Sequence, residues 1–335
     1  MKSPAFWWQA AGAAAWLLSP FGAVYGALAA MRMGRQGIDP GVPVICVGNF
    51  VAGGAGKTPA ALAIAGILIE SGVHSFFLTR GYGGKIKGPH RVDPSRDGPR
   101  EIGDEALLLT RAAPVIVAAD RAAGGRLAAR EGAEVIIMDD GLQNPGLAKT
   151  LLFAVVDGET GAGNGFCIPA GPLRAPLGAQ LEHVHAVIVV GGGVAGVELG
   201  ARAKALGKIV FAARLEPDHA SALALKGRRV LAFAGIGRPE KFFQSLRACG
   251  AEIAGQRAYA DHARMPDKEA ADLLATARRL SLQLVTTEKD LIRLDNSFAH
   301  RMLRDACLTL PVTLVFEDLE ALAALLRQAI QKPPA

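Results

Sequence analysis

The chain has few cysteines and few aromatic residues. Its 335 residues include four cysteines, with no Cys-x-x-Cys pair and no regular spacing between them. This pattern excludes a disulfide framework and a cysteine zinc site, so we expect reduced, mostly buried thiols in a cytoplasmic protein. Aromatic residues make up 6% of the chain, and no run of lysine or arginine alternates with them. The sequence therefore predicts no nucleic-acid partner.

Charge is missing from one end of the chain. No charged side chain occurs between Lys2 and Arg32, and all three tryptophans fall within the first 16 residues. We predict that residues 1–36 are a retained, membrane-associating helical segment. A cleaved signal peptide, with Ala27-Leu28-Ala29 as its cleavage site, and a buried hairpin are the alternatives.

Two serine–proline pairs divide this segment. Ser3-Pro4 and Ser19-Pro20 each combine a serine N-cap with proline at the first helical position. We therefore expect two helices, over 4–18 and 20–33, with a hinge at Pro20 because proline lacks an N–H group. Each would be shorter than the ~30 Å hydrocarbon core of a bilayer. Whether the segment spans the bilayer or lies in one leaflet stays open.

The remaining composition is that of a folded, phosphate-binding protein. Half of the residues are hydrophobic and the mean hydropathy is +0.26, which excludes intrinsic disorder. Forty glycines without a Gly-X-Y period exclude collagen and indicate many tight turns. The net charge of +6 is best explained by attraction to phosphates on a nucleotide, a substrate and a bilayer.

From residue 40 onward, short apolar runs alternate with helical patterns, which is typical of α/β proteins with a mostly parallel sheet. We predict a P-loop NTPase-type sheet flanked by helices in residues 37–220, and a second, smaller α/β domain in residues 221–335. A last helix, over 319–331, could contact either domain. The predicted strands are 43–47, 75–79, 114–118, 134–138, 151–156, 186–190 and 209–213, then 230–234, 252–255, 283–286 and 311–316.

A glycine-rich loop follows the first of these strands. The run Gly53-Gly54-Ala55-Gly56-Lys57-Thr58-Pro59 leads into an alanine-rich helix over 60–71. Glycines let backbone N–H groups surround phosphates at the positive end of a helix. Lys57 would reach the outer phosphates and Thr58 would bind Mg²⁺. The usual spacing would place glycine at 51, where this chain has valine, so this is a deviant form of the P-loop.

A P-loop requires an acid at the end of a neighbouring strand. Asp139 and Asp140 follow four apolar residues, and one of them could hold Mg²⁺ while the other organises the site. A simple turn at the end of the strand is the alternative. The nearest match to a guanine-recognition motif is Thr287-Glu288-Lys289-Asp290, with its lysine one place too late. This favours ATP over GTP.

Several blocks of the sequence together resemble one family, the tetraacyldisaccharide 4'-kinases. The resemblance covers nearly the whole chain. Its blocks begin with the glycine-rich loop and Gly48-Asn49 before it, and continue with Arg80-Gly81-Tyr82-Gly83-Gly84, Gly103-Asp104-Glu105, Asp139-Asp140-Gly141 with Gln143, Gly163-Asn164-Gly165, Pro169-Ala170-Gly171-Pro172-Leu173-Arg174, Gly235-Ile236-Gly237 with Pro239 and Phe242, Asp261-His262 and Thr286-Thr287-Glu288-Lys289-Asp290.

The resemblance implies an activity and its site. The expected reaction is transfer of the γ-phosphate of ATP to the 4'-hydroxyl of a tetraacyldisaccharide 1-phosphate, giving lipid IV-A on the cytoplasmic face of the inner membrane. Asp104 and His262 would form the base pair, completed by closure of the second domain. The expected enzyme is a monomer that uses Mg²⁺. The site residues implied are Lys57, Asp104, Asp139 and His262 for catalysis, Gly53 to Pro59 for ATP, Thr58, Glu105, Asp139 and Asp140 for the metal, and Asn49, Arg80, Tyr82, Arg121, Gln143, Asn144 and Arg174 for substrate.

Alternatives remain for individual residues and for the function. Asp104 could be only a helix cap and His262 a surface residue, while Asp261 either orients His262 or caps a turn. The family has phenylalanine and histidine where this chain has Leu142 and Asn144, which puts any acid–base role at 144 in doubt. A membrane-associated regulatory ATPase is the alternative function. That class often has a second lysine in its phosphate loop, and residues 48–56 contain none.

Overall fold

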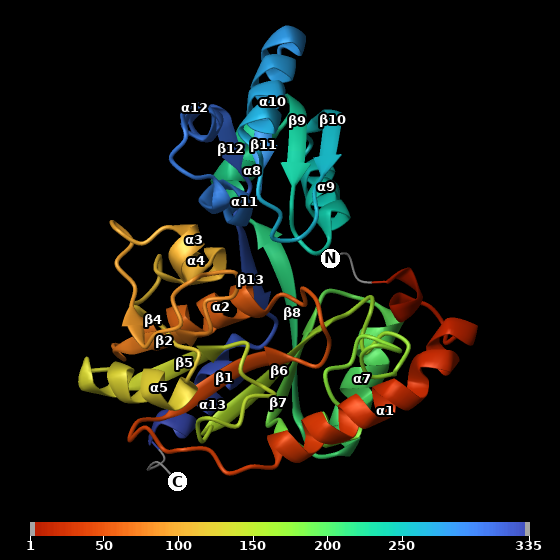
Figure 1. The fold of residues 1–335 in the computed structure, drawn as a ribbon, viewed down its shortest axis with the longest axis vertical. Helices are drawn as coiled ribbons and strands as arrows, with labels where there is room; N and C mark the ends of the chain where they lie inside the picture. The colour runs from red at the N-terminus through yellow and green to blue at the C-terminus, as the bar shows by residue number, and fades with distance from the viewer. Residues whose placement is uncertain (1–3, 332–335) are drawn as a thin grey trace.

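The computed structural model describes residues 4–331, and within them two β-sheets lie one above the other (Figure 1). The large sheet has nine strands in this described range and is parallel except at its two edges, where β13 and β3 pair antiparallel. This architecture confirms the predicted α/β class. The order across the sheet is β13 (Val312–Phe316), β8 (Ile209–Pro217), β7 (Ala186–Val190), β6 (Leu151–Asp157), β1 (Val44–Asn49), β5 (Val135–Asp139), β2 (Ser75–Thr79), β4 (Val115–Val117) and β3 (His90–Arg91).

The large sheet is covered by helices on both faces. Side chains alternate along a strand, so Ile45 and Val47 of β1 enter one core while Val44 and Cys46 enter the other. Because both faces are buried, the central strands are continuously apolar instead of alternating. One face carries α2 (Lys57–Glu70), α3 (Pro99–Ile102), α4 (Asp104–Leu109) and α13 (Leu319–Gln331); the other carries α5 (Arg121–Arg130), α6 (Leu177–His183) and α7 (Val194–Ala205).

The small sheet is parallel throughout, in the order β10-β9-β11-β12. Helices cover both of its faces, and the short α11 stands at the edge that faces the large sheet (Figure 1). The sequence pattern missed β12 and β3, which have only three and two residues. The elements are β9 (Arg229–Ala234), β10 (Glu252–Ala258), β11 (Gln283–Thr286), β12 (Cys307–Thr309), α8 (His219–Leu225), α9 (Pro239–Ala248), α10 (Asp267–Leu280), α11 (Glu288–Arg293) and α12 (Phe298–Ala306).

The last strand departs from the sequence prediction, which grouped 311–316 with the strands of the second domain. Instead β13 pairs antiparallel with β8 at the edge of the large sheet, with Val312 opposite Pro217 and Phe316 opposite Ala213. Helix α13 then buries Leu322 and Leu326 in the core beneath α2. The chain thus enters the small sheet from β8 and returns by β13 (Figure 1). The boundary near residue 220 remains a prediction.

The N-terminal segment also differs from its prediction. Ala5–Trp8 form a 3-10 turn, and one helix, α1, runs over Ala13–Met33 with Pro20 inside it. The carbonyl of Trp16, which an N–H at position 20 would otherwise satisfy, accepts a hydrogen bond of 2.8 Å from Ser19 Oγ. Ser19 therefore compensates for the missing donor instead of capping a new helix. Ser3 lies outside the described residues.

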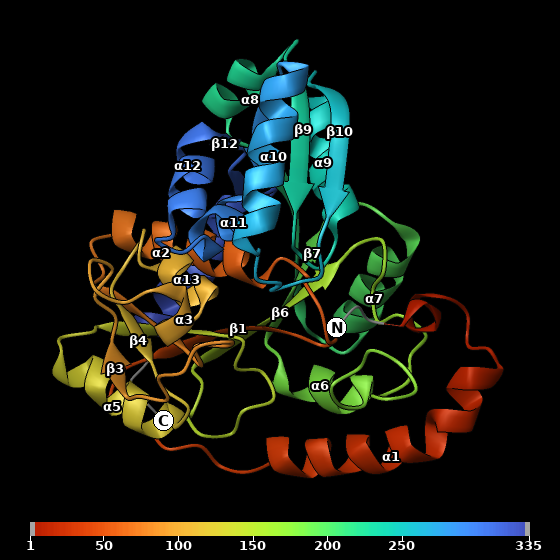
Figure 2. The same cartoon turned by 45° about the horizontal axis from the view of Figure 1, so that its top comes forward.

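Helix α1 lies along the flank of the large domain (Figure 2). Gly22 and Gly26 face Cys167, and a β-carbon at Gly22 would come within 2.7 Å of the Cys167 carbonyl oxygen. Within residues 4–331, α1 is the one helix long and apolar enough to cross a membrane, at about 31 Å for 21 residues. Its outward face exposes Trp16, Leu17, Phe21, Val24, Tyr25, Leu28 and Met31.

Candidate active site

The glycine-rich loop lies between β1 and α2, as the sequence predicts. Gly53 and Gly56 have φ angles of 131° and 89°, which favour glycine. Asn49, the last residue of β1, donates from Nδ2 to the Gly53 carbonyl at 3.0 Å and so fixes the loop. Lys57 opens α2, and the N–H groups of its first turn form a ready site for an anion.

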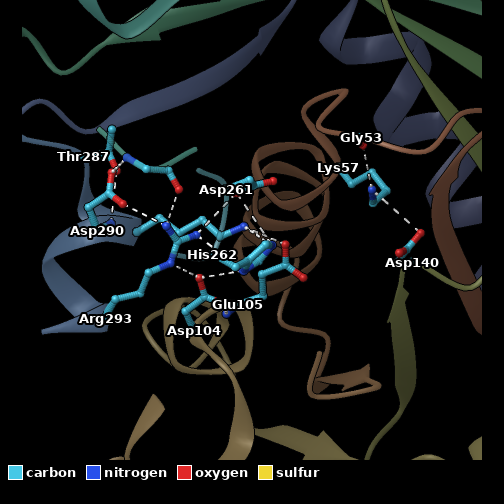
Figure 3. Close-up of polar contacts among 12 residues, drawn as sticks. Gly53, Lys57, Asp104, Glu105, Asp140, Asp261, His262, Thr287, Asp290 and Arg293 are labelled. Carbon is cyan, nitrogen blue, oxygen red and sulfur yellow. Dashed lines mark hydrogen bonds and ion pairs between the residues drawn. The ribbon is translucent and has the colours of Figure 1, made fainter. Parts of the chain in front are cut away.

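Two carboxylates at the end of β5 face this loop, and they differ in burial and in hydrogen-bond partners. Asp140 is paired with Arg174, at 2.8 Å from Nη1 to Oδ1. The Oδ1 atom of Asp140 also lies 3.8 Å from Lys57 Nζ, as Figure 3 shows. Asp139 is 1% exposed, and its Oδ1 has no hydrogen-bond partner among the described residues. Burial, together with the charges of Glu105 and Asp140, raises the pKa of Asp139 to about 7.

The unpaired oxygen of Asp139 indicates whether a cation would fit at the end of β5. A buried carboxylate oxygen without a partner is costly, and a divalent cation would satisfy it. Glu105 is close enough to act on Asp139 electrostatically, and Thr58 stands in the first turn of α2. These oxygen donors fit Mg²⁺.

A second polar cluster joins the two domains. Asp104, the first residue of α4, is 5% exposed, and its Oδ2 lies 3.2 Å from Nδ1 of His262 in the small domain (Figure 3). Arg293 of α11 donates to the same oxygen. Burial would raise the pKa of Asp104, but the hydrogen bond with His262 and the charges of Lys289 and Arg293 outweigh it and lower the pKa. Asp104 is therefore an ionised carboxylate that lies against His262.

His262 itself is held in an unusual position. Its φ of 56° lies in the left-handed region, which few residues other than glycine adopt. Its Nε2 lies 3.5 Å from Lys289 Nζ and 3.7 Å from Asp261 Oδ1. The Tyr82 ring meets the imidazole edge to face, with 5.1 Å between centroids. Asp261 thus lies near His262, as one of the two sequence hypotheses requires.

Lys289 links this cluster to the acids. Its Nζ lies 2.8 Å from Glu105 Oε1. Burial would lower the pKa of Lys289, but the charges of Glu105 and Asp104 outweigh it and raise the pKa, so the ammonium stays charged. We define the α4–α11 interface as Asp104, Glu105, Lys289 and Arg293. From the sequence, Lys289 was named only as part of a motif, without a role at the site, and Arg293 was missed. The available signal for Arg293 was its spacing of three residues from Asp290 on one helix.

A second contact between the domains, the β6–α9 interface, consists of Asp157, Glu159, Arg238 and Lys241. Asp157 ends β6, and its two carboxylate oxygens accept from Arg238 Nη1 at 2.8 Å and Lys241 Nζ at 2.6 Å. Burial would raise the pKa of Asp157, but its bonds and charge interactions with Lys241 and Arg238 lower it. No motif in the sequence indicated this interface.

Three predicted substrate residues support the loop from behind. Arg174 donates from Nε to the Val51 carbonyl at 3.1 Å, in addition to its pair with Asp140. Gln143 donates to the Asn49 carbonyl and to Gln180 Oε1, each at 2.8 Å. In this conformation Arg174, Gln143 and Asn49 hold the phosphate loop in place.

The other predicted substrate residues lie farther along the sheet edge. Arg121 is 3% exposed, donates from Nη1 to the Ala118 carbonyl, and leaves Nε without a partner among the described residues. Burial and the neighbouring charge of Arg80 lower its pKa, so two cations converge here. Asn144 closes a turn by accepting from the Gly146 N–H at 2.8 Å.

Three features together define the class of P-loop kinases. They are the strand–glycine loop–helix unit, the paired acids on a neighbouring parallel strand, and a second α/β domain that supplies a histidine. Comparison with known sequences narrows this class. The sequence profile of the tetraacyldisaccharide-1-P 4'-kinase (LpxK) family matches residues 14–331, and the chain belongs to this family.

Individual relatives agree with this assignment. The tetraacyldisaccharide 4'-kinase of Nitrobacter winogradskyi is 50% identical over 332 residues, which cover 99% of this chain and 98% of the relative. That of Methylobacterium radiotolerans is 54% identical over 340 residues, covering 99% of this chain and 100% of the relative. The crystal structure of LpxK from Aquifex aeolicus in complex with ATP has a TM-score of 0.71 and 25% identity, and covers 94% of this chain and 99% of that one.

Proposed function

We propose that this protein transfers the γ-phosphoryl group of ATP to the 4'-hydroxyl of tetraacyldisaccharide 1-phosphate, giving lipid IV-A in lipid A biosynthesis. The observation that carries the proposal is the Asp104–His262 pair beside a phosphate loop. Glu105, next to Asp104, and Lys57 of the phosphate loop both act electrostatically on Asp139, so the pair and the loop both lie close to this carboxylate. The small-domain loop also approaches the phosphate loop, since a β-carbon at Gly237 would lie 3.5 Å from the Gly54 nitrogen.

The side chains can divide the chemistry between them. The ATP phosphates bind at the N-terminus of α2, where Lys57 neutralises their charge. The acceptor oxygen bonds to the γ-phosphorus while the bond from that phosphorus to the β,γ-bridging oxygen breaks, and ADP leaves. Nε2 of His262 takes the hydroxyl proton, and Asp104 holds the Nδ1–H so that the Nε2 lone pair is available.

Mg²⁺ belongs to the same proposal. When bound, it would neutralise charge on the β- and γ-phosphates. Asp139 would bind it directly, since its Oδ1 is buried and unpaired, whereas Asp140 is already paired with Arg174 and Lys57. Thr58 and Glu105 are the further candidate ligands.

The acceptor would lie along the edge that carries Arg80, Arg121 and Tyr82. The two arginines suit the 1-phosphate, because Arg121 is a buried cation with an unused donor. Tyr82 is 62% exposed beside His262 and so can contact the sugar that carries the reacting hydroxyl. Asn144, whose side chain lies close to Arg121 across Gly146, would contribute polar contacts only.

The acyl chains of the acceptor are held in a membrane, and α1 offers an apolar face that can bind the membrane surface. Its outward face is apolar, while its glycine face is docked on the large domain. A helix docked along its length in this way favours lying in one leaflet over crossing the bilayer. We propose a location on the cytoplasmic face of the inner membrane, where ATP is present. A monomer suffices, because the phosphate loop and His262 come from one chain.

The direct test is an acceptor assay. Purified full-length protein in detergent is incubated with Mg-ATP and tetraacyldisaccharide 1-phosphate, and the lipids are analysed by mass spectrometry. We expect a bisphosphorylated product, and none from an acceptor whose 4'-hydroxyl is replaced by hydrogen. ATP binding without product from the authentic acceptor would contradict the proposed function.

A further inference from the structure

Helix α11 brings a permanent cation to the carboxylate that orients His262. Arg293 donates from Nε to Asp104 Oδ2, the oxygen that also lies 3.2 Å from His262 Nδ1. The other oxygen, Oδ1, accepts the Glu105 N–H at 3.0 Å. Three donors therefore fix the plane of the Asp104 carboxylate, and Figure 3 shows Arg293 reaching it from the side opposite the phosphate loop.

The guanidinium of Arg293 is itself held rigidly. Its Nη1 donates to Asp290 Oδ1 at 2.8 Å and to the Gly235 carbonyl. Asp290 in turn accepts from the Gly235 N–H at 3.0 Å and from Thr287 Oγ1 at 2.6 Å. Arg293 and Asp290 are 10% and 9% exposed at their side chains. A buried, forked donor held from two sides is pre-organised for its third partner, Asp104.

This arrangement has a consequence for proton transfer. His262 can use Nε2 as a base only in the tautomer with its proton on Nδ1, and that tautomer depends on an ionised, correctly turned Asp104. A carboxylate without Arg293 would be free to rotate or to bind a proton. Arginine cannot lose its charge, so it keeps the carboxylate in place before and after His262 takes a proton.

We propose that Arg293 is a positioning residue for phosphoryl transfer, which fixes the Asp104 carboxylate so that His262 presents Nε2 to the acceptor hydroxyl. The inference rests on the proposed function and assigns to α11 a part in the chemistry beyond joining the domains.

The test compares two arginines that each link α11 to the large domain, Arg293 on α11 itself and Arg111 in the turn after α4. Arg293→Met removes the contact with Asp104, together with the bond to Asp290 and the approach of Nη2 to His262 Nδ1 at 3.5 Å. Arg111→Met removes an ion pair with Glu288 of α11, which also links the domains but does not touch His262 or Asp104. We expect Arg293→Met to lower kcat by ~10²-fold with the KM for ATP nearly unchanged, and Arg111→Met to leave both constants near wild type. Thermal unfolding confirms that each variant is folded, and Arg293→Lys, which keeps the charge without the fork, should recover part of kcat.

A double-mutant comparison separates positioning from a structural role. If Arg293 acts through Asp104, then Arg293→Met should cost little in an Asp104→Ala background. An equal fold-loss in both backgrounds, a wild-type kcat for Arg293→Met, or an equal loss for Arg111→Met would overturn the inference. Wild-type protein that phosphorylates no acceptor would instead contradict the proposed function, so the two failures are distinguishable.

Discussion

The α4–α11 and β6–α9 interfaces both join the domains by ion pairs, but their ion pairs differ in burial and in what else they contact. At the β6–α9 interface, Arg238 and Lys241 are about one-third exposed at their side chains. At the α4–α11 interface, Arg293 and Asp104 are 10% and 5% exposed, and the carboxylate has a second partner in His262. Exposed ion pairs contribute little and are screened by salt, whereas a buried pair is specific in geometry. The α4–α11 interface therefore connects the small domain to the carboxylate that contacts His262, whereas the β6–α9 interface makes no hydrogen bond or ion pair with Asp104 or His262 among the described residues.

The largest expected effect comes from removing His262, the side chain that contacts Asp104 of the α4–α11 interface. His262→Ala should lower kcat by ~10²–10⁴-fold, because no other described side chain pairs with Asp104 and can act as a base. ATP affinity should change far less, since none of the described hydrogen-bond or ion-pair partners of His262 belongs to the phosphate loop. Steady-state kinetics and equilibrium ATP binding measure the two effects. Equal losses in turnover and in ATP binding would refute the role of base.

A smaller effect is expected at the β6–α9 interface. Asp157→Asn removes the negative charge that Arg238 and Lys241 share. The amide keeps an oxygen that can accept the Thr160 N–H, as Asp157 Oδ1 does in the wild type. We expect the free energy of unfolding to fall by about 1 kcal/mol, because the partners are partly solvated. Denaturant unfolding measures this change. A loss of kcat as large as that of His262→Ala would remove the distinction between the interfaces.

The smallest expected effect is on the pH dependence of the free energy of unfolding. The pKa of Asp157 is lowered from its usual 3.8 in the folded protein. A carboxylate of this kind contributes stability above its unfolded pKa and loses it as the pH falls through its folded value. The stability difference between wild type and Asp157→Asn should therefore be constant near neutral pH and shrink below pH ~4. Unfolding curves at a series of pH values check this, and a difference that grows on acidification would contradict it.

The features that could be predicted from the sequence are those whose residues are contiguous along the chain. The phosphate loop and Asp139-Asp140 are contiguous, so their order along the chain carried the signal. The Asp104–His262 pair was implied by family resemblance and not by spacing, since 158 residues separate the two. Arg293 had no such motif, because its contact with Asp104 exists only after the domains meet.

Two errors have the same origin. The pair Ser19-Pro20 is a local helix-start signal, but the Ser19 hydroxyl satisfies the Trp16 carbonyl and the helix continues. The apolar run of β13 identifies a strand without saying which sheet it joins. It joins β8 at the edge of the large sheet because the chain returns there from the small domain. A pattern in one segment cannot specify its partner.

The path of the chain through β8 and β13 makes the small domain an insertion into the large one. The β13 strand and α13 are synthesised after the whole small domain, yet β13 forms the edge of the large sheet and both elements contact α2 within one core. The helix that follows the phosphate loop is thus left partly bare on the ribosome until the inserted domain has been made. A nascent chain that stops before Val312 would expose that apolar layer to aggregation and proteolysis.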